Sequence, residues 1–142
     1  QIMKIKLLKI VICFFVLTSP SLSNTNFFEE GLNFFKNKKF EKAKFKFEQD
    51  IVFNPKSEMS YLYLSKIFKN LKNKDLEEQN LKTVILLNPE NEEAIYFLAK
   101  LKLNESDYKK SKELNTKLLK LCNKFCDKSK KLQKEIENLS QK

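Results

Sequence analysis

The chain has 142 residues, enough for one domain, and its 42% hydrophobic and 32% charged residues are typical of a soluble globular helical protein. A single glycine and three prolines argue against an architecture of sheets. All 28 basic residues are lysine and there is no histidine, so the side chain most used for acid–base catalysis is missing. The net charge of +10 does not predict a nucleic-acid partner, because base readout most often uses arginine.

Residues 1–23 have the pattern of a secretory signal peptide: a start with three lysines, an apolar core over residues 10–17, and a small-x-small cleavage site ending at Ser23. Cleavage there would remove three lysines and no acid, lowering the net charge from +10 to +7. We therefore expect export to the periplasm, or an equivalent space, of a bacterium. The alternative is an inner-membrane anchor, but the apolar core falls well short of the roughly 20 residues that span a bilayer.

Apolar residues recurring every three or four positions predict seven helices after this segment. Asn26 followed by Glu29 is a candidate N-cap for the first helix, and Asp75 with Glu78 is expected to cap the fourth. In chain order, the helices are expected over residues 24–36, 40–53, 57–71 and 75–87, then from residue 91 or 92, from residue 108 after the Ser106-Asp107 cap, and over 127–139.

The adjacent acids Glu29-Glu30 and Glu77-Glu78 are candidates for a pair of catalytic carboxylates. Neighbouring side chains on a helix project about 100° apart and do not converge on a substrate. We interpret both pairs as surface charge and capping. No glycine-rich phosphate loop or nucleophile motif is present, so the sequence predicts no enzyme, no cofactor and no small-molecule substrate.

The helical pattern repeats at an interval of 34 residues. Each of the first two units ends in an Asn-Pro stop, at Asn54-Pro55 and Asn88-Pro89. The seven repeating positions are occupied in turn by Phe27, Glu30, Gly31, Phe34, Ala43, Phe47 and Pro55, then by Tyr61, Leu64, Ser65, Phe68, Glu77, Leu81 and Pro89, then by Ile95, Leu98, Ala99, Lys102, Ser111, Asn115 and Asn123.

These positions resemble the tetratricopeptide repeat (TPR) family, whose 34-residue helix-turn-helix unit carries W-x-x-L-G-x-x-Y, then A-x-x-x-F, then P. Glu30 and Glu77 depart from the pattern, and the third unit is degenerate in its second half. The resemblance implies an all-α fold, a right-handed α-solenoid of about three TPR-like repeats. The expected units are 24–56, 57–90 and 91–124, with a C-terminal capping helix within 125–142. A helical hairpin array that meets the period by accident is the alternative.

The function implied by the resemblance is protein binding, by an exported adaptor or assembly factor that holds a peptide or helix of an envelope protein in a concave groove. The expected groove residues are Phe28, Leu32, Phe35, Leu62, Lys66, Lys69, Tyr96, Lys100 and Leu103. The lysines suit an acidic segment or a free C-terminal carboxylate. Alternatively, the apolar members of this set pack one repeat on the next, since aromatic stripes are often core.

Cys122 and Cys126 remain after cleavage, and two cysteines in an oxidising compartment favour a disulfide. The C-x-x-x-C spacing follows a helix rather than opening one, whereas a helix N-terminus is what lowers a thiol pKa, so we expect a staple rather than a reactive pair. Two thiols without histidine do not make a metal site. Unbonded packing thiols, a thiol-disulfide redox protein and a membrane-tethered structural repeat protein remain as alternatives.

Overall fold

The computed structural model describes residues 26–140, so the expected signal segment lies outside the described residues. The described part consists of seven helices without a strand, and none of these helices is both long and apolar enough to cross a membrane. Their bounds are α2 (Phe27–Lys36), α3 (Phe40–Phe53), α4 (Glu58–Asn70), α5 (Lys74–Leu87), α6 (Glu92–Asn104), α7 (Tyr108–Leu121) and α8 (Cys126–Ser140). All seven correspond to predicted helices; α3 has the predicted bounds, and α2, α4, α5 and α8 differ from the prediction at one or both ends.

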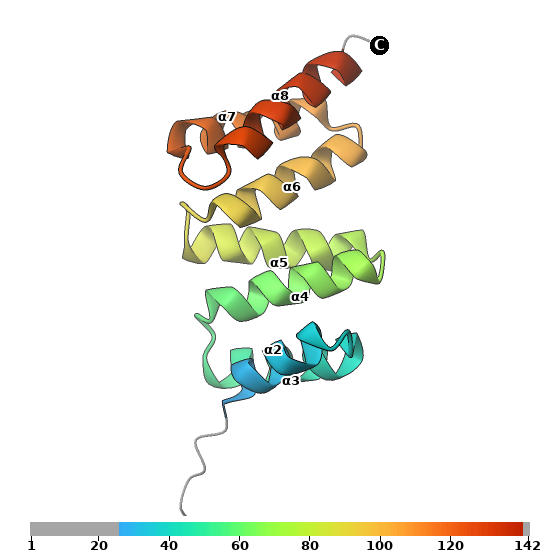
Figure 1. Ribbon diagram of the computed structural model, residues 1–142, viewed down its shortest axis with the longest axis vertical. Helices are drawn as coiled ribbons and strands as arrows, with labels where there is room; N and C mark the ends of the chain where they lie inside the picture. The colour runs from blue at the N-terminus through green and yellow to red at the C-terminus, as the bar shows by residue number, and fades with distance from the viewer. Residues whose placement is uncertain (1–25, 141–142) are drawn as a thin grey trace, which may run out of the picture.

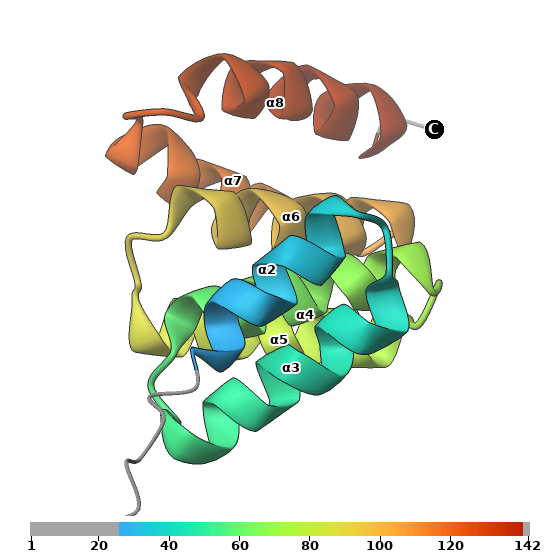
Figure 2. The same cartoon turned by 60° about the horizontal axis from the view of Figure 1, so that its bottom comes forward.

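The helices stack in chain order along the long axis of the molecule (Figure 1). Three hairpins, α2 with α3, α4 with α5 and α6 with α7, make the closest contacts, and α8 packs mainly on α7. Figure 2 shows the first hairpin lying across the second. This arrangement is an α-solenoid of helical repeats followed by a C-terminal helix, as the sequence predicted.

The hairpin turns repeat at the same 34-residue interval as the sequence. Lys38, Lys72 and Ser106 occupy equivalent places and all have positive φ, at 56°, 57° and 62°. Each turn is closed by the same backbone hydrogen bond, in which the residue after this position donates to a carbonyl near the end of the first helix. The interval therefore describes backbone conformation as well as side-chain pattern.

Side-chain caps begin four of the helices. Asn26 accepts a hydrogen bond from the Glu29 N–H, as predicted, and Asn91 and Asp107 cap α6 and α7 in the same way. The predicted cap of α5 is wrong, because Asn73 rather than Asp75 accepts from the helix, at the Leu76 N–H. An N-cap oxygen satisfies one of the unpaired N–H groups of the first turn.

The two helices of the first hairpin approach closely at Gly31. A Cβ atom placed there would lie 2.8 Å from Cε1 of Phe47, whose side chain is fully buried. The equivalent pairs in the next repeats are Ser65 with the smaller Leu81 and Ala99 with the smaller Asn115. Glycine is therefore needed where the opposing side chain is largest.

Where the third repeat departs from the repeat pattern, its polar side chains form ion pairs or hydrogen bonds. Lys102 has only 14% of its side chain exposed and pairs with Glu78 at 2.7 Å and Glu105 at 3.0 Å. The Ser111 hydroxyl donates to the Ala99 carbonyl at 2.8 Å. Since a buried polar group is costly only when it is unsatisfied, these substitutions are compatible with a packed repeat.

Helix α8 continues the 34-residue interval. Its buried residues Ser129, Leu132 and Ile136 fall 34 positions after Ile95, Leu98 and Lys102. Ser129 exchanges hydrogen bonds with the fully buried Asn115 of α7, donating to its Oδ1 at 2.8 Å and accepting from its Nδ2 through the backbone carbonyl at 3.1 Å. The C-terminal helix is thus placed like the first helix of a further unit.

Candidate partner-binding face

The nine predicted groove residues come from α2, α4 and α6, the first helices of the three hairpins. Leu62 and Leu103 are only 1% and 5% exposed and belong to the hydrophobic core, which corrects their assignment to an open groove. The other seven keep exposed surface: Phe28, Leu32, Phe35, Lys66, Lys69, Tyr96 and Lys100. We call the surface formed by these seven side chains the first-helix face.

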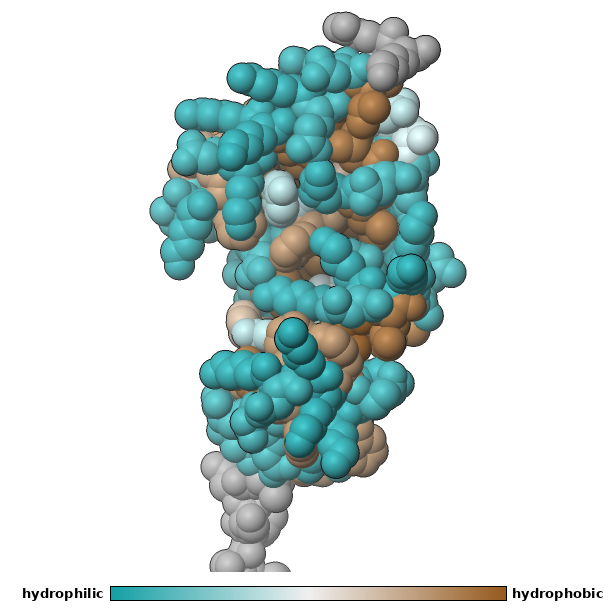
Figure 3. All heavy atoms as spheres, turned by 45° about the vertical axis from the view of Figure 1, so that its right-hand side comes forward, coloured by the Kyte–Doolittle hydropathy of each residue, from teal (hydrophilic) through white to brown (hydrophobic). Residues whose placement is uncertain are grey.

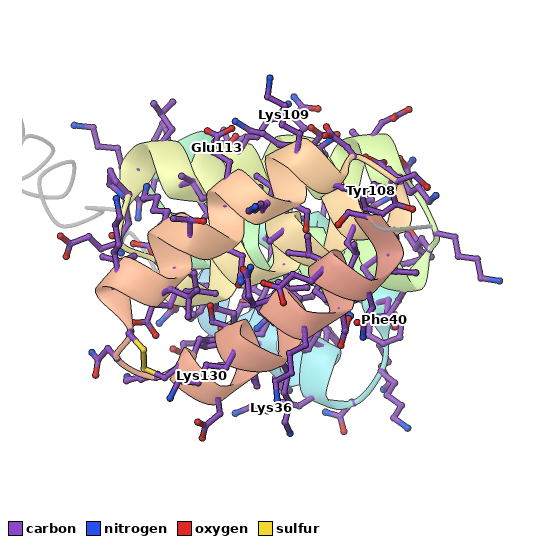
Figure 4. The ribbon with its side chains drawn as sticks, turned by 90° about the horizontal axis from the view of Figure 1, so that it is seen from above. Lys36, Phe40, Tyr108, Lys109, Glu113 and Lys130 are labelled. Atoms are coloured by element: carbon purple, nitrogen blue, oxygen red, sulfur yellow. A yellow bond between two sulfur atoms is a disulfide. The ribbon has the colours of Figure 1, made fainter. Side chains whose placement is uncertain are left out.

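Figure 4 views the stack from its C-terminal end and separates the two sides of the molecule. Lys36 of α2 and Lys130 of α8 lie on the side of the first helices, while Lys109 and Glu113 of α7 lie on the opposite side. In the oblique view of Figure 3, polar side chains cover most of the surface and hydrophobic residues show in the gaps between them.

Two aromatic residues of the first-helix face also pack repeats together. The rings of Phe28 and Phe35 lie 6.0 Å and 5.0 Å from that of Tyr63 in α4, which stacks on buried Phe47 at 5.3 Å. These distances are typical of favourable aromatic pairs. Both side chains therefore form part of the junction between the first and second repeats, as the packing alternative expected.

The three lysines of the face differ in their partners. Lys66 pairs with Glu93 of α6 at 2.9 Å, and Lys100 pairs with Glu135 of α8 at 2.7 Å. Among the described residues, Lys69 makes no ion pair, and its ammonium lies over the Phe97 ring at 4.7 Å from the centroid. Lys69 is consequently the lysine of this face that is free to meet a carboxylate.

A pocket of about 240 Å³ opens where α2, α4, α5 and α6 meet. Three predicted residues line it, namely Phe35, Lys66 and Lys69. The rest of its wall, which the sequence analysis did not assign to a site, consists of Ser65, Asn70, Glu77 and Phe97. We call this hollow the α4–α6 pocket.

The pocket exists because successive repeats are not identical. Phe97 occupies in the third repeat the place that Tyr63 has in the second. At the first junction the ring of Phe35 packs on Tyr63, but the residue equivalent to Phe35 at the second junction is Lys69. A lysine does not fill the space of an aromatic ring beside Phe97, so the second junction is left hollow.

Glu77 is the buried charge of this pocket, which corrects its interpretation as surface charge. Its side chain stands at the repeat position of Ala43 and is 6% exposed. Its carboxylate has no hydrogen-bond or ion-pair partner among the described residues, but its oxygens remain open to the pocket. Burial raises the pKa of Glu77, and the nearby Lys69 ammonium offsets only part of that rise. The departure of Glu77 from the alanine of the repeat pattern was the sequence signal for this site.

A second carboxylate feature joins the repeats at the opposite ends of these helices. Glu58 and Glu92 are equivalent, and each reaches the loop after its own hairpin. Glu58 accepts from the Asn88 and Asn91 amides, while Glu92 accepts from the backbone N–H groups of residues 123–125 at 2.5–2.8 Å. Burial alone would raise the pKa of Glu92, but these three donors hold it below its usual value.

The two cysteines lie at the two ends of the loop held by Glu92. Cys122 ends α7 with φ 35°, and Cys126 is the first residue of α8, so the expectation that the pair does not open a helix is wrong. Their Cα atoms are 4.7 Å apart, a separation that suits a disulfide, and Figure 4 shows the sulfur atoms joined. The described residues hold no cluster of three or more potential metal ligands.

These features define an α-solenoid of paired helices with a lysine-bearing first-helix face and, in the pocket of that face, the carboxylate of Glu77. No protein-family model and no curated protein sequence matches the chain. Its fold is nevertheless that of TPR domains of known structure, at sequence identities that show the fold alone.

Three solved structures illustrate this similarity. The first TPR of Spaghetti (RPAP3), bound to the HSP90 peptide SRMEEVD, has a TM-score of 0.68 at 18% identity, covering 81% of this chain and 88% of that one. The Yersinia enterocolitica type III secretion chaperone SycD, in complex with a peptide of the translocator YopD, has a TM-score of 0.71 at 15% identity, with 80% and 89% covered. The Arabidopsis OM64 TPR domain has a TM-score of 0.66 at 22% identity, with 76% and 92% covered.

Proposed function

We propose that the protein is an exported adaptor or assembly factor that holds a segment of an envelope protein against its first-helix face. The observation that carries this proposal is the α4–α6 pocket, where two aromatic rings, a lysine without an ion pair and the Glu77 carboxylate converge. Convergent polar groups in an apolar hollow are typical of binding sites. The peptides bound by RPAP3 and SycD support a peptide as the kind of partner.

The lysines of the face favour a partner segment with acidic residues or a free C-terminal carboxylate. Lys69 supplies the first contact because it has no competing ion pair. Lys66 and Lys100 would exchange Glu93 and Glu135 for partner carboxylates, which replaces one half-exposed ion pair by another of the same kind. Electrostatic attraction of this kind acts mainly on association and is weakened by salt.

The proposed role requires export, with cleavage after Ser23. The intact mass of the protein recovered from the cell envelope tests this directly. A mass that corresponds to residues 24–142 is expected, and a mass that retains the first 23 residues would instead support the membrane-tethered alternative.

In the exported protein we propose that Cys122 and Cys126 form a staple that fixes the loop between α7 and α8. Free-thiol labelling of unreduced protein should find neither cysteine reactive. A thiol-exchange function is the competing candidate, because Cys126 opens a helix. Full complementation by a variant with both cysteines changed to serine would exclude thiol exchange, whereas loss of activity with unchanged stability would support it.

The charge of Lys69 gives a test of partner capture. Lys69→Glu should reduce the amount of partner recovered by chemical crosslinking in the native envelope, while leaving helicity unchanged. Lys109→Glu is the matched control, because it makes the same charge change on the opposite side of the stack (Figure 4). Equal loss in both variants, or no loss in either, would contradict a partner held at Lys69.

A further inference from the structure

The α4–α6 pocket has the dimensions of a site for a single side chain. Its volume of about 240 Å³ is below the roughly 300–1,000 Å³ of pockets that hold whole small molecules. The rings of Phe35 and Phe97 come from the repeats on either side of α4. An occupant therefore needs a flat apolar body that can lie against aromatic rings.

The pocket combines the Glu77 carboxylate, which when ionised only accepts hydrogen bonds, with the ammonium donors of Lys66 and Lys69. The Glu77 side chain is more than nine-tenths buried, and its carboxylate has no hydrogen-bond or ion-pair partner among the described residues but remains open to the pocket. The Ser65 hydroxyl already donates to the Leu62 carbonyl at 2.7 Å, and the Asn70 amide donates to the Lys66 carbonyl at 2.9 Å. An occupant must consequently carry a donor at the end that reaches Glu77.

Other side chains meet this requirement less well. A phenylalanine would cover Glu77 without giving it a partner, and leaving a buried charge unpaired is costly. A carboxylate would be repelled by Glu77. An arginine or lysine would approach past the ammonium groups of Lys66 and Lys69, of which only Lys66 is neutralised by an ion pair.

We propose that the α4–α6 pocket binds a tyrosine side chain of the partner segment, with the ring between Phe35 and Phe97 and the phenol O–H donating to the Glu77 carboxylate. The phenol oxygen can also accept a hydrogen bond from the Lys69 ammonium at the rim. Acidic residues on either side of this tyrosine would then meet the lysines of the first-helix face. The inference rests on the proposed function and names the residue that anchors the partner.

Side-chain analogues test the pocket without knowledge of the partner. The probes are 4-methylphenol, toluene and n-propylguanidinium, which stand for tyrosine, phenylalanine and arginine, titrated by NMR into isotope-labelled protein produced from the full-length sequence. We expect saturable shifts at Phe35 and Phe97, with 4-methylphenol bound about tenfold more tightly than toluene, as a hydrogen bond to a charged group would give.

Glu77→Ala provides the decisive variant, because alanine already occupies the equivalent position at residue 43 and the fold accommodates it. This variant should lose the preference for 4-methylphenol while still binding toluene. Asp75→Ala, an exposed acid on the same helix, should retain the preference. Equal binding of the two aromatic probes, preference for n-propylguanidinium, or an unchanged preference in Glu77→Ala would overturn the tyrosine assignment.

The probe titration and the Lys69→Glu crosslinking test the tyrosine pocket and the adaptor function separately. If the probes do not bind as expected but Lys69→Glu still lowers partner recovery, the partner lies on the first-helix face without a tyrosine anchor. If the probes bind as expected but no partner depends on Lys69, the pocket assignment stands and the adaptor function falls.

Discussion

At the scale of single residues, the fold depends on the match between Gly31 and Phe47. Gly31→Ala should destabilise the protein by about 1–3 kcal/mol through overpacking. The higher helix propensity of alanine offsets up to about 1 kcal/mol of this loss. The Phe47 ring cannot withdraw easily, because it is fully buried and stacks on Tyr63. Urea unfolding should show a lower midpoint with an unchanged slope.

A second substitution supplies the control. Adding Phe47→Leu to Gly31→Ala places a small side chain opposite a leucine, as Ser65 stands opposite Leu81 in the second repeat, and should cost less than the sum of the two single changes. Strictly additive effects would mean that the close approach at Gly31 does not limit the packing of α2 on α3.

The buried Asn115 gives a second prediction at this scale. Asn115→Ala leaves the Ser129 hydroxyl without its acceptor and opens space between α7 and α8, so it should cost about 1–3 kcal/mol or more. Asn115→Leu combined with Ser129→Ala replaces the polar pair by apolar groups and should restore part of the loss. Thermal unfolding of the three proteins measures this, and no loss in Asn115→Ala would contradict the role of the pair.

The repeat pattern predicted where such residues stand but not what they contact. Glu77, Lys102 and Asn115 were all recognisable as departures from the pattern. Their surroundings were not predictable, because Lys102 pairs with Glu78 of the preceding hairpin and Asn115 with Ser129 of α8. Sequence spacing identifies equivalent positions within repeats, whereas these contacts join different repeats.

At the scale of helices and loops, Glu92 fixes the loop that leads into α8. The pKa of Glu92 is lower in the folded protein than its usual value, so its carboxylate stabilises the fold above the unfolded pKa. This contribution is lost as pH falls through the folded-state pKa. Glu92→Gln should therefore be less stable than the parent protein near neutral pH, and the difference should shrink under acidic conditions.

Urea denaturation of both proteins over a pH series checks this dependence. Glu90→Gln is the control, because Glu90 is exposed in the preceding loop and accepts no backbone N–H from residues 123–125. A stability difference for Glu92→Gln that stays constant with pH would show that the carboxylate charge is not what holds the loop.

Helix positions were largely predictable, and the exceptions have a local cause. Apolar periodicity predicted α3 with its observed bounds, and Asn26 was a correct N-cap. The cap of α5 was misassigned because Asn73 and Asp75 are both good N-cap residues, and periodicity does not decide between them. Glu78, expected in that cap, instead pairs with Lys102 at 2.7 Å.

At the scale of the whole molecule, the 34-residue interval sets the architecture. The candidate site lies where single residues differ between equivalent repeat positions. The interval fixes the order of the hairpins and extends into α8. The α4–α6 pocket arises where Lys69 and Glu77 replace the Phe35 and Ala43 of the first repeat. A site formed by differences between repeats cannot be predicted from what the repeats share.

Site-specific photocrosslinking in the native cell tests whether the partner lies on the first-helix face. A photoreactive residue would be placed at Lys36 or at Asn104. Both positions are exposed and occupy, in the first and third repeats, the place of the pocket residue Asn70. The control positions are Lys109 and Leu86, which is 80% exposed. We expect one discrete crosslinked product from positions 36 and 104, and none from 86 and 109. The same product from positions 86 and 109, with none from 36 and 104, would contradict this placement of the partner.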